Sequence, residues 1–249
     1  MSGAGPYPAL YGWRVARPRY PGRSETPAPL APAERTVGQV VGEAIKLYAA
    51  HWRRALVIGV LPAVAGVAAV ELGGWRGVAL ASGVGSLVHT ASFLVACGLV
   101  GGVGLRTRRA ATAYVAGVLV FVPVPFLAAL FVLPALAWLA LLGLVVPVAL
   151  IEGTPFRRSF GRTVELARAD YVHVLGTLAT LAILTLLSQG VVAFTLQEFS
   201  EQTERLAAVL AGIVLSPLLF LGAAIVYVDQ EARWRVRAER GAVTRKRAK

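Results

Sequence analysis

Cysteine, histidine and charged residues are all scarce in this sequence of 249 residues. The single cysteine, Cys97, excludes an internal disulfide bond. The histidines, His51, His89 and His173, lie far apart, and no Cys/His cluster has the spacing of metal ligands. We therefore expect no metal, no cofactor and no catalytic residues. Charged residues make up 15% of the chain, whereas soluble domains have about 25%, which argues against a soluble enzyme.

Hydrophobic residues, in contrast, make up 57% of the sequence and gather in long runs without charge. The hydrocarbon core of a bilayer is about 30 Å thick, and roughly 20 apolar residues of helix cross it. The run 110–151 would reach about 63 Å as one helix, so it must form two spans. The runs are apolar on all sides, whereas membrane β-strands alternate apolar and polar residues. The charge-free runs are Ala55–Val70, Gly77–Leu105, Ala110–Ile151, Tyr171–Leu196 and Leu206–Val228.

These runs predict an all-α, polytopic integral membrane protein with six transmembrane helices. The two helices of the run 110–151 can be separated at Pro123–Pro125 or at Val132–Pro134, because proline interrupts helices. We favour the second position, which makes the two helices similar in length and leaves the earlier prolines as a kink. The predicted spans lie near 55–72, 77–105, 110–131, 133–151, 171–195 and 207–228.

Both ends of the chain are polar and basic. Residues 1–35 contain seven of the fourteen prolines and are predicted to be a disordered tail rich in proline and arginine. They lack the basic start and apolar core of a signal peptide. Residues 36–228 form the predicted membrane domain, and residues 229–249 form a second basic tail.

The basic residues are distributed unequally between the two sides of the predicted membrane domain. With six spans, one side receives the N-terminal segment with eight Lys/Arg, residues 106–109 with three, residues 152–170 with four, and the C-terminal tail with eight. The other side receives only Arg76 and Arg205. Basic residues next to spans stay in the cytoplasm. We therefore predict a multi-pass protein of a bacterial cytoplasmic membrane, with both termini in the cytoplasm.

Two segments on the basic side have the pattern of amphipathic helices that lie on a membrane surface. Near 155–169, the stretch "EGTPFRRSFGRTVELARADY" begins with Thr154 as a helix cap and Pro155 in the first turn. Its apolar residues recur on one face and its arginines lie elsewhere, which is typical of a helix in the interface plane. Such a helix attracts anionic lipids by about 1 kcal/mol per basic residue.

The second amphipathic segment lies near 37–53, just before the first span. Thr36 and Gln39 have the spacing of a capping box. Val40, Ala44 and Tyr48 then share one apolar face. We expect this segment to lie on the cytoplasmic membrane surface as well. The C-terminal basic residues are assigned to anionic lipid rather than to nucleic acid, because they would be tethered beside a membrane.

The segments "TVGQVVGEAIKLYAAHWRRAL", "VVPVALIEG", "FRRSFGRTVELARADYVHVLG" and "SPLLFLGAAIVYVDQEARWR" together carry a family likeness. They resemble the six-helix membrane domain related to bacterial glycerophosphoryl diester phosphodiesterases. Thr163 stands where that family has serine. The resemblance implies a stand-alone membrane module without the family's catalytic barrel. The matching positions are Pro147, Glu152, Arg162, Thr163, Leu166, Gly176, Pro217, Tyr227, Asp229 and Arg233.

The candidate site residues are the polar side chains in or next to the spans. His89 lies near the middle of the second span, and an ionisable residue at that depth indicates either function or a hydrogen bond to a Ser, a Thr or a carbonyl of a neighbouring helix. Glu71 is expected to pair with Arg76 across the turn that follows the first span. The remaining candidates are Glu152, Arg162, Arg168, Asp229 and Arg233.

Glu152 and Asp229 both end a span on the basic side. We expect them to pair with Arg162, Arg168 or Arg233 and to fasten the surface helices to the bundle; the alternative is a polar entrance for a substrate. The predicted function is a non-catalytic membrane module that organises lipids or partner proteins, with a homo-oligomer also open. A transporter for a small solute or a lipid is the alternative, and an anchor for a soluble enzyme is a third.

Overall fold

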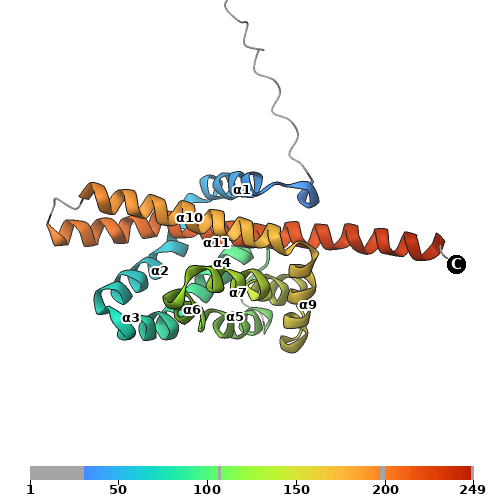
Figure 1. Cartoon of the computed structure of the whole chain (residues 1–249), viewed down its shortest axis with the longest axis horizontal. Helices are drawn as coiled ribbons and strands as arrows, with labels where there is room; N and C mark the ends of the chain where they lie inside the picture. The colour runs from blue at the N-terminus through green and yellow to red at the C-terminus, as the bar shows by residue number, and fades with distance from the viewer. Residues whose placement is uncertain (1–30, 106–107, 197–199, 248–249) are drawn as a thin grey trace, which may run out of the picture. The chain divides into compact units, whose positions relative to one another are not determined.

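The computed structural model describes residues 31–105, 108–196 and 200–247, and Figure 1 shows that every regular element in these ranges is a helix. The predicted disordered tail lies outside the described residues except for its last five positions. The helices are α1 (Val37–Ala50), α2 (Trp52–Leu72), α3 (Gly74–Leu80), α4 (Ser86–Gly101), α5 (Arg108–Phe121), α6 (Val124–Leu130), α7 (Val132–Leu142), α8 (Val145–Pro147), α9 (Phe156–Ala169), α10 (Tyr171–Leu196) and α11 (Glu201–Arg247), with the short turns η1 (Pro32–Glu34), η2 (Ala81–Gly85) and η3 (Val148–Glu152).

Six helical stretches of the described chain are long and apolar enough to cross a membrane. The predicted all-α, multi-pass membrane architecture is confirmed. Five stretches lie within four residues of the predicted bounds, and the sixth extends well past them. The stretches are Trp52–Leu72, Gly74–Gly101, Arg108–Leu130, Val132–Glu152, Tyr171–Leu196 and Gln202–Arg240.

The helices of the long apolar run 110–151 are interrupted after α5, after α6 and after α7, and the first two interruptions lie next to proline. A first break separates α5 from α6, and Pro125 lies in the first turn of α6. The reversal between the third and fourth spans falls at Phe131, whose backbone is extended. Pro134 follows in the first turn of α7, where the missing N–H removes no helical hydrogen bond. The reversal lies beside the favoured position, and the earlier prolines form the kink.

Helix α11 is the central element and contacts α1, α2, α4, α9 and α10. It spans 47 residues without a break, which corresponds to about 70 Å and exceeds the bilayer core twofold. The helix therefore continues without a break past residue 228, where the predicted sixth span ends. Asp229 and Gln230 continue the helix and are fully buried, because the chain around Arg35 and the start of α10 pack against this part of α11.

Helices α1 and α9 differ in how they lie on this central helix. In Figure 1, α9 crosses the end of the bundle, whereas α1 runs alongside α10 and α11. Val40 and Ala44 of α1 are fully buried against residues of α10 and α11, including Val174 and Val226. Protein therefore covers the part of the apolar face of α1 that carries Val40 and Ala44, a contact that the sequence did not predict.

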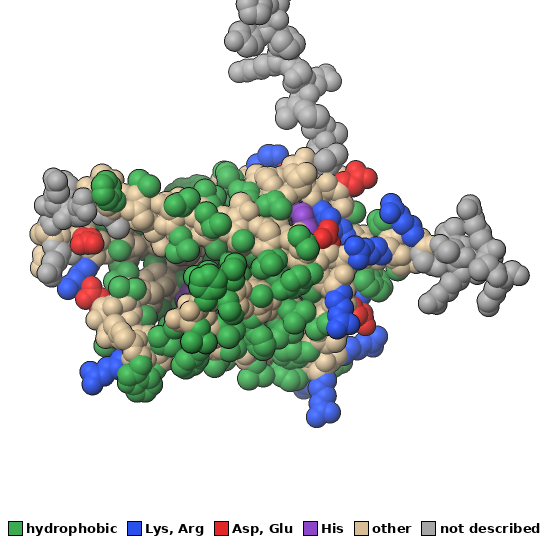
Figure 2. Space-filling view, viewed as in Figure 1, with side chains coloured by type: hydrophobic (Ala, Val, Ile, Leu, Met, Phe, Trp, Pro, Cys, Tyr) green, Lys and Arg blue, Asp and Glu red, His purple; other side chains and the backbone are tan. Residues whose placement is uncertain are grey.

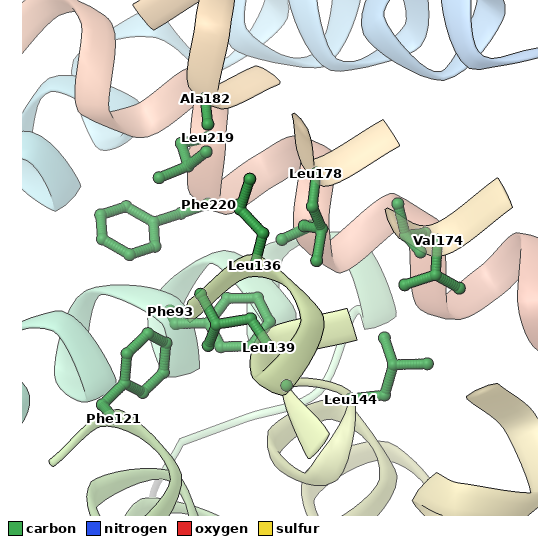
Figure 3. A pocket seen from close by; sticks show the side chains of 13 residues that line it. Phe93, Phe121, Leu136, Leu139, Leu144, Val174, Leu178, Ala182, Leu219 and Phe220 are labelled. Carbon is green, nitrogen blue, oxygen red and sulfur yellow. The ribbon is translucent and has the colours of Figure 1, made fainter. Parts of the chain in front are cut away.

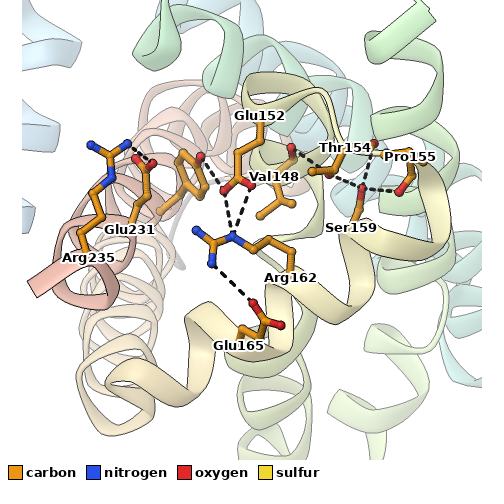
Figure 4. Close-up of polar contacts among 10 residues, drawn as sticks. Val148, Glu152, Thr154, Pro155, Ser159, Arg162, Glu165, Glu231 and Arg235 are labelled. Atoms are coloured by element: carbon orange, nitrogen blue, oxygen red, sulfur yellow. Dashed lines mark hydrogen bonds and ion pairs between the residues drawn. The ribbon is translucent and has the colours of Figure 1, made fainter. Parts of the chain in front are cut away.

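Helix α9 begins one residue later than predicted. Pro155 occupies the capping position, and Thr154 instead exchanges a hydrogen bond of 2.7 Å with the Ser159 hydroxyl (Figure 4). Ser159, Thr163, Leu166 and Ala167 are fully buried, so the bundle rather than lipid covers the inner face of α9. Its arginines Arg157, Arg158 and Arg168 point outward.

The surface of the bundle is apolar over wide areas, as Figure 2 shows. Monomeric soluble proteins expose no continuous apolar patches of this extent, whereas lipid-facing helices do. The exposed large side chains include Val57, Leu61, Val70, Leu119, Leu130, Phe131, Ile183, Leu187, Val191, Phe194, Leu206 and Leu210. Close helix contacts depend on small residues: Gly59 of α2 lies against the backbone of Ile213 on α11.

Candidate functional site

The end of the bundle that carries the arginines contains a network of ion pairs, which we call the polar clamp. It consists of Arg35, Glu152, Arg162, Asp170, Asp229 and Arg233. These residues come from the segment before α1, from the end of the fourth span, from α9, from the junction of α9 with α10, and from α11. The polar clamp therefore joins segments that are far apart in the sequence.

The first pair of the polar clamp links Arg35 to Asp229. The Nη1 atom of Arg35 lies 3.2 Å from Oδ1 of Asp229, whose side chain is completely buried. Its second oxygen, Oδ2, has no hydrogen-bond partner among the described residues. A buried carboxylate loses its hydration, and Arg35 compensates its charge by direct contact.

The second pair links Arg233 to Asp170. The distance from Nη1 of Arg233 to Oδ2 of Asp170 is 2.6 Å, and Nη2 of Arg233 donates to the backbone carbonyl of Arg35 at 2.6 Å. The other carboxylate oxygen of Asp170 accepts the backbone N–H of His173 at 3.2 Å. Asp170 thus caps the first turn of α10 and holds α11 at the same time.

The third pair, shown in Figure 4, links Arg162 to Glu152. The Nε atom of Arg162 lies 3.3 Å from Oε2 of Glu152, and the hydroxyl of Tyr227 donates to Oε1 at 3.2 Å. The guanidinium carbon of Arg162 is 3.9 Å from the ring centroid of Trp234, a cation–π contact. Arg162 also lies 3.5 Å from Glu165 on the exposed side of α9.

The sequence placed part of this network correctly. The pairing of Glu152 with Arg162 is confirmed. Asp229 is paired with Arg35, which was not among its expected partners, and Arg233 is paired with Asp170 instead. Arg168 forms no ion pair among the described residues; its carbonyl accepts from Arg237 at 3.3 Å.

Sequence reasoning missed Arg35, Asp170 and Trp234. One signal was available for Asp170, because aspartate directly before a helical run is a favoured cap residue. Nothing in the sequence identifies Arg35, whose partner is 194 residues away. Arginine side chains form ion pairs with Glu152, Asp170 and Asp229, and these pairs link separate helices to one another.

His89 lies apart from the polar clamp, between the rings of Phe121 and Phe220, whose centroids are 6.5 and 6.0 Å away. Its Nδ1 atom lies 2.6 Å from the carbonyl of Gly85 in the same span. If His89 is structural, its hydrogen-bond partner was expected on a neighbouring helix. A carbonyl only accepts, so Nδ1 carries the proton in this bond. The Nε2 atom, which has no partner among the described residues, is the acceptor of the neutral ring.

A hollow of about 820 Å³, which we call the trough, opens at the low-charge end of the bundle. It is visible on the left of Figure 2, with acidic and basic side chains at its edge. Glu71 at this edge pairs with Arg205 of α11 at 2.9 Å, so the expected pair of Glu71 with Arg76 is wrong. Gly73 and Gly74, both with positive φ, reverse the chain there, and the start of α11 passes beside Glu71.

A second cavity, of about 110 Å³, lies on the other side of the aromatic side chains near His89 (Figure 3). Phe93, Phe121 and Phe220 line it together with Leu139 and Leu178. Its lining among the described residues is entirely apolar, so it offers an apolar molecule a surface but no orienting side-chain hydrogen bond.

The described residues contain no group of three or more His, Cys, Asp and Glu side chains that could hold a metal ion. Comparison with protein-family models, with curated proteins and with solved structures finds no match for this chain.

Proposed function

We propose that this chain is a non-catalytic module of a bacterial cytoplasmic membrane that organises anionic lipids, or a partner protein, at its basic end. The polar clamp carries this proposal. It engages the acids Glu152, Asp170 and Asp229 in holding helices together, so they brace the bundle and do not present a reactive group. The basic side chains that remain exposed on α9 are then the surface available to a ligand.

The exposed arginines of α9 suit phosphate groups. Arg157, Arg158 and Arg168 point away from the bundle, and Figure 1 shows that α9 crosses the ends of the other helices. A basic helix at the level of the lipid headgroups gains about 1 kcal/mol per basic residue from anionic lipids. The resemblance to the membrane domain related to glycerophosphoryl diester phosphodiesterases remains a prediction and points to the same class of module.

Native mass spectrometry of the purified protein with phosphatidylglycerol tests this proposal. We expect the triple variant Arg157→Gln/Arg158→Gln/Arg168→Gln to retain fewer phosphatidylglycerol molecules than the wild type. Arg76→Gln, an exposed arginine at the opposite end, is the matched control and should change nothing. Equal lipid retention by the triple variant would contradict lipid organisation at α9, and cross-linking would then have to reveal a protein partner. Hydrolysis of a glycerophosphodiester by the wild type, lost in His89→Ala, would refute a non-catalytic role.

The proposed orientation has a separate test in intact cells. The only native cysteine, Cys97, is completely buried and therefore a weak background for thiol labelling. We expect a membrane-impermeant thiol reagent to label Arg76→Cys and to leave Arg158→Cys unlabelled until the cells are opened. The reverse pattern would place the basic end outside the cell and exclude the proposed location.

A carrier for a small solute or a lipid is the second candidate function. The trough favours it, because polar side chains reach from its edge to His89 and the aromatic residues Phe93, Phe121 and Phe220 lie beyond. Carriers bind their substrates near the bilayer midplane. Flux into proteoliposomes that depends on the protein would establish this function, and absence of flux for ions, metabolites and lipids would argue against it.

A further inference from the structure

The trough has the length of one membrane leaflet. Its floor is the stretch of α11 from Glu204 to Ser216, and its walls are the second half of α2 and the last part of α10. The twelve steps from residue 204 to residue 216 rise about 18 Å, close to half of the roughly 30 Å hydrocarbon core. His89 of α4 also lines it. Since both walls belong to spans with lipid-facing residues, a membrane lipid can reach the trough from the side.

The polar groups of the trough are mainly hydrogen-bond acceptors. Glu204 is exposed and forms no ion pair among the described residues, and Glu71 is paired with Arg205. Further along the trough, Gln189, the hydroxyl of Ser216 and Nε2 of His89 have no internal partner among the described residues. The described side chains therefore place two carboxylates against one guanidinium at the edge, with neutral oxygen and nitrogen acceptors beyond it.

This arrangement selects a headgroup by charge and by hydrogen-bond type. An ammonium group has three donors and no acceptor, so it complements the carboxylates of Glu71 and Glu204 at the edge of the trough. A phosphate beside it can approach Arg205, the one cation lining the trough among the described residues. An anionic headgroup without an amine would instead face two carboxylates at short range. The choice of headgroup therefore depends on the amine.

The remaining lining suits the acyl part of a lipid. Small residues form much of the floor, namely Ala207, Ala208 and Ala211. Larger apolar side chains stand on the walls, among them Val67 on α2 and Leu186 on α10. Gly212 lies where α11 meets Ala63 of α2, so the two helices touch there. A free polar amine would leave this apolar surface uncovered, whereas a phospholipid covers it with its chains.

We propose that the trough is a binding site for one phospholipid with a primary-amine headgroup, of the phosphatidylethanolamine type, from the leaflet at the low-charge end. This proposal extends the function proposed above to a second class of lipid at the opposite end of the bundle. It rests on the membrane architecture and not on the arginines of α9, so each can fail without the other.

Native mass spectrometry with equimolar phosphatidylethanolamine, phosphatidylcholine and phosphatidylglycerol tests the site. The wild type should retain phosphatidylethanolamine in preference to the other two. Glu204→Gln should weaken its binding about tenfold, since hydrogen bonds to charged groups contribute roughly 1.5–3 kcal/mol. Glu239→Gln, the same chemical change at the exposed basic end, should leave binding unchanged, and neither variant should change the retention of phosphatidylglycerol at α9.

A variant that fills the trough keeps the proposal testable if a polar variant folds poorly. Ala208 is exposed on the floor of the trough, so Ala208→Trp should leave the fold intact and displace the bound phosphatidylethanolamine. Unchanged retention in both Glu204→Gln and Ala208→Trp would overturn the site. Equal retention of phosphatidylcholine would refute selection of a primary amine. Displacement by free ethanolamine at low millimolar concentration would show a solute site in place of a lipid site.

Discussion

The two ends of the bundle both carry acid–arginine pairs, yet the pairs differ in their surroundings. At the basic end the side chains of Asp229 and Arg35 are 0% and 18% exposed. At the low-charge end those of Glu71 and Arg205 are 44% and 54% exposed. Exposed pairs contribute little to stability because water and salt screen them, whereas breaking a buried pair leaves an uncompensated charge. The same kind of ion pair therefore fastens the helices at the basic end firmly and those at the low-charge end only weakly.

This difference corresponds to different roles for the two ends. The polar clamp joins the first residues of the membrane domain to α9, α10 and α11, and its acids are occupied. At the trough, Glu204, Gln189 and Ser216 keep unused acceptor capacity. A rigid end and an end with open polar groups are the arrangement expected of a scaffold that holds a ligand site.

The largest loss of stability is expected at Arg35, in the buried pair at the basic end. Arg35→Ala should lower the free energy of unfolding by about 3–5 kcal/mol, because it removes the arginine that pairs directly with the buried Asp229. Unfolding in detergent micelles by denaturant or heat measures it. Lys46→Ala, which removes an exposed pair with Glu43, is the control with less than about 1 kcal/mol. The double variant Arg35→Ala/Asp229→Asn should recover part of the loss, and equal losses for Arg35→Ala and Lys46→Ala would show that the polar clamp does not stabilise the bundle.

A smaller effect is expected where α2 crosses α11, between the two ends. A methyl group added at Gly59 would lie 2.2 Å from the carbonyl oxygen of Ile213. Gly59→Ala should therefore destabilise the protein by about 1–3 kcal/mol through overpacking. Gly66→Ala on the same helix has open space and should stabilise it slightly, since alanine favours helix. Similar melting temperatures for both variants would contradict the close crossing.

The next largest loss of stability is expected at Arg162 of the polar clamp. Arg162→Lys keeps the charge but loses the planar contact with Trp234 and the fixed donor to Glu152, so we expect a loss of about 1–2 kcal/mol. Arg158→Lys on the exposed face of α9 should have no measurable effect. In a double-mutant cycle, Trp234→Leu should cost less in the Arg162→Lys background than alone. Strict additivity would show that the two side chains do not interact.

The smallest effect is expected at the low-charge end. Glu71→Gln should change the free energy of unfolding by less than about 1 kcal/mol, and added salt should reduce even that. Glu152→Gln, the same change in the polar clamp, should cost more and depend less on salt. If the two substitutions had equal effects and equal salt dependence, the distinction between a locked and an open end would be lost.

Much of the fold could be predicted because hydrophobic length and helix-breaking residues act locally. The spans and the break near Phe131 follow from the length of apolar runs and from the positions of proline. The position of α1 could not be predicted in this way. Its apolar face, with Val40 and Ala44, suits a lipid surface and a protein surface equally, and the proximity of α10 and α11 decided between them.

The candidate site was predictable only where its partners are close in the sequence. Glu152 and Arg162 are ten residues apart, and Arg162 was one of the three arginines expected as a partner. Asp229 and Arg35 are 194 residues apart, and any of several arginines would satisfy the same charge. The trough was not predicted, because its lining comes from four helices and its polar residues look unrelated along the chain.

By itself, then, the sequence determined that this chain is a helical membrane protein with its basic residues gathered at one end, since hydrophobic length and charge need no partner to exert their effect. Only the tertiary structure decided which arginine neutralises Asp229, that α1 packs against protein, and that acceptors from α2, α4, α10 and α11 meet in one trough. The physical reason is that pairing and packing depend on distances in space between residues that are distant along the chain.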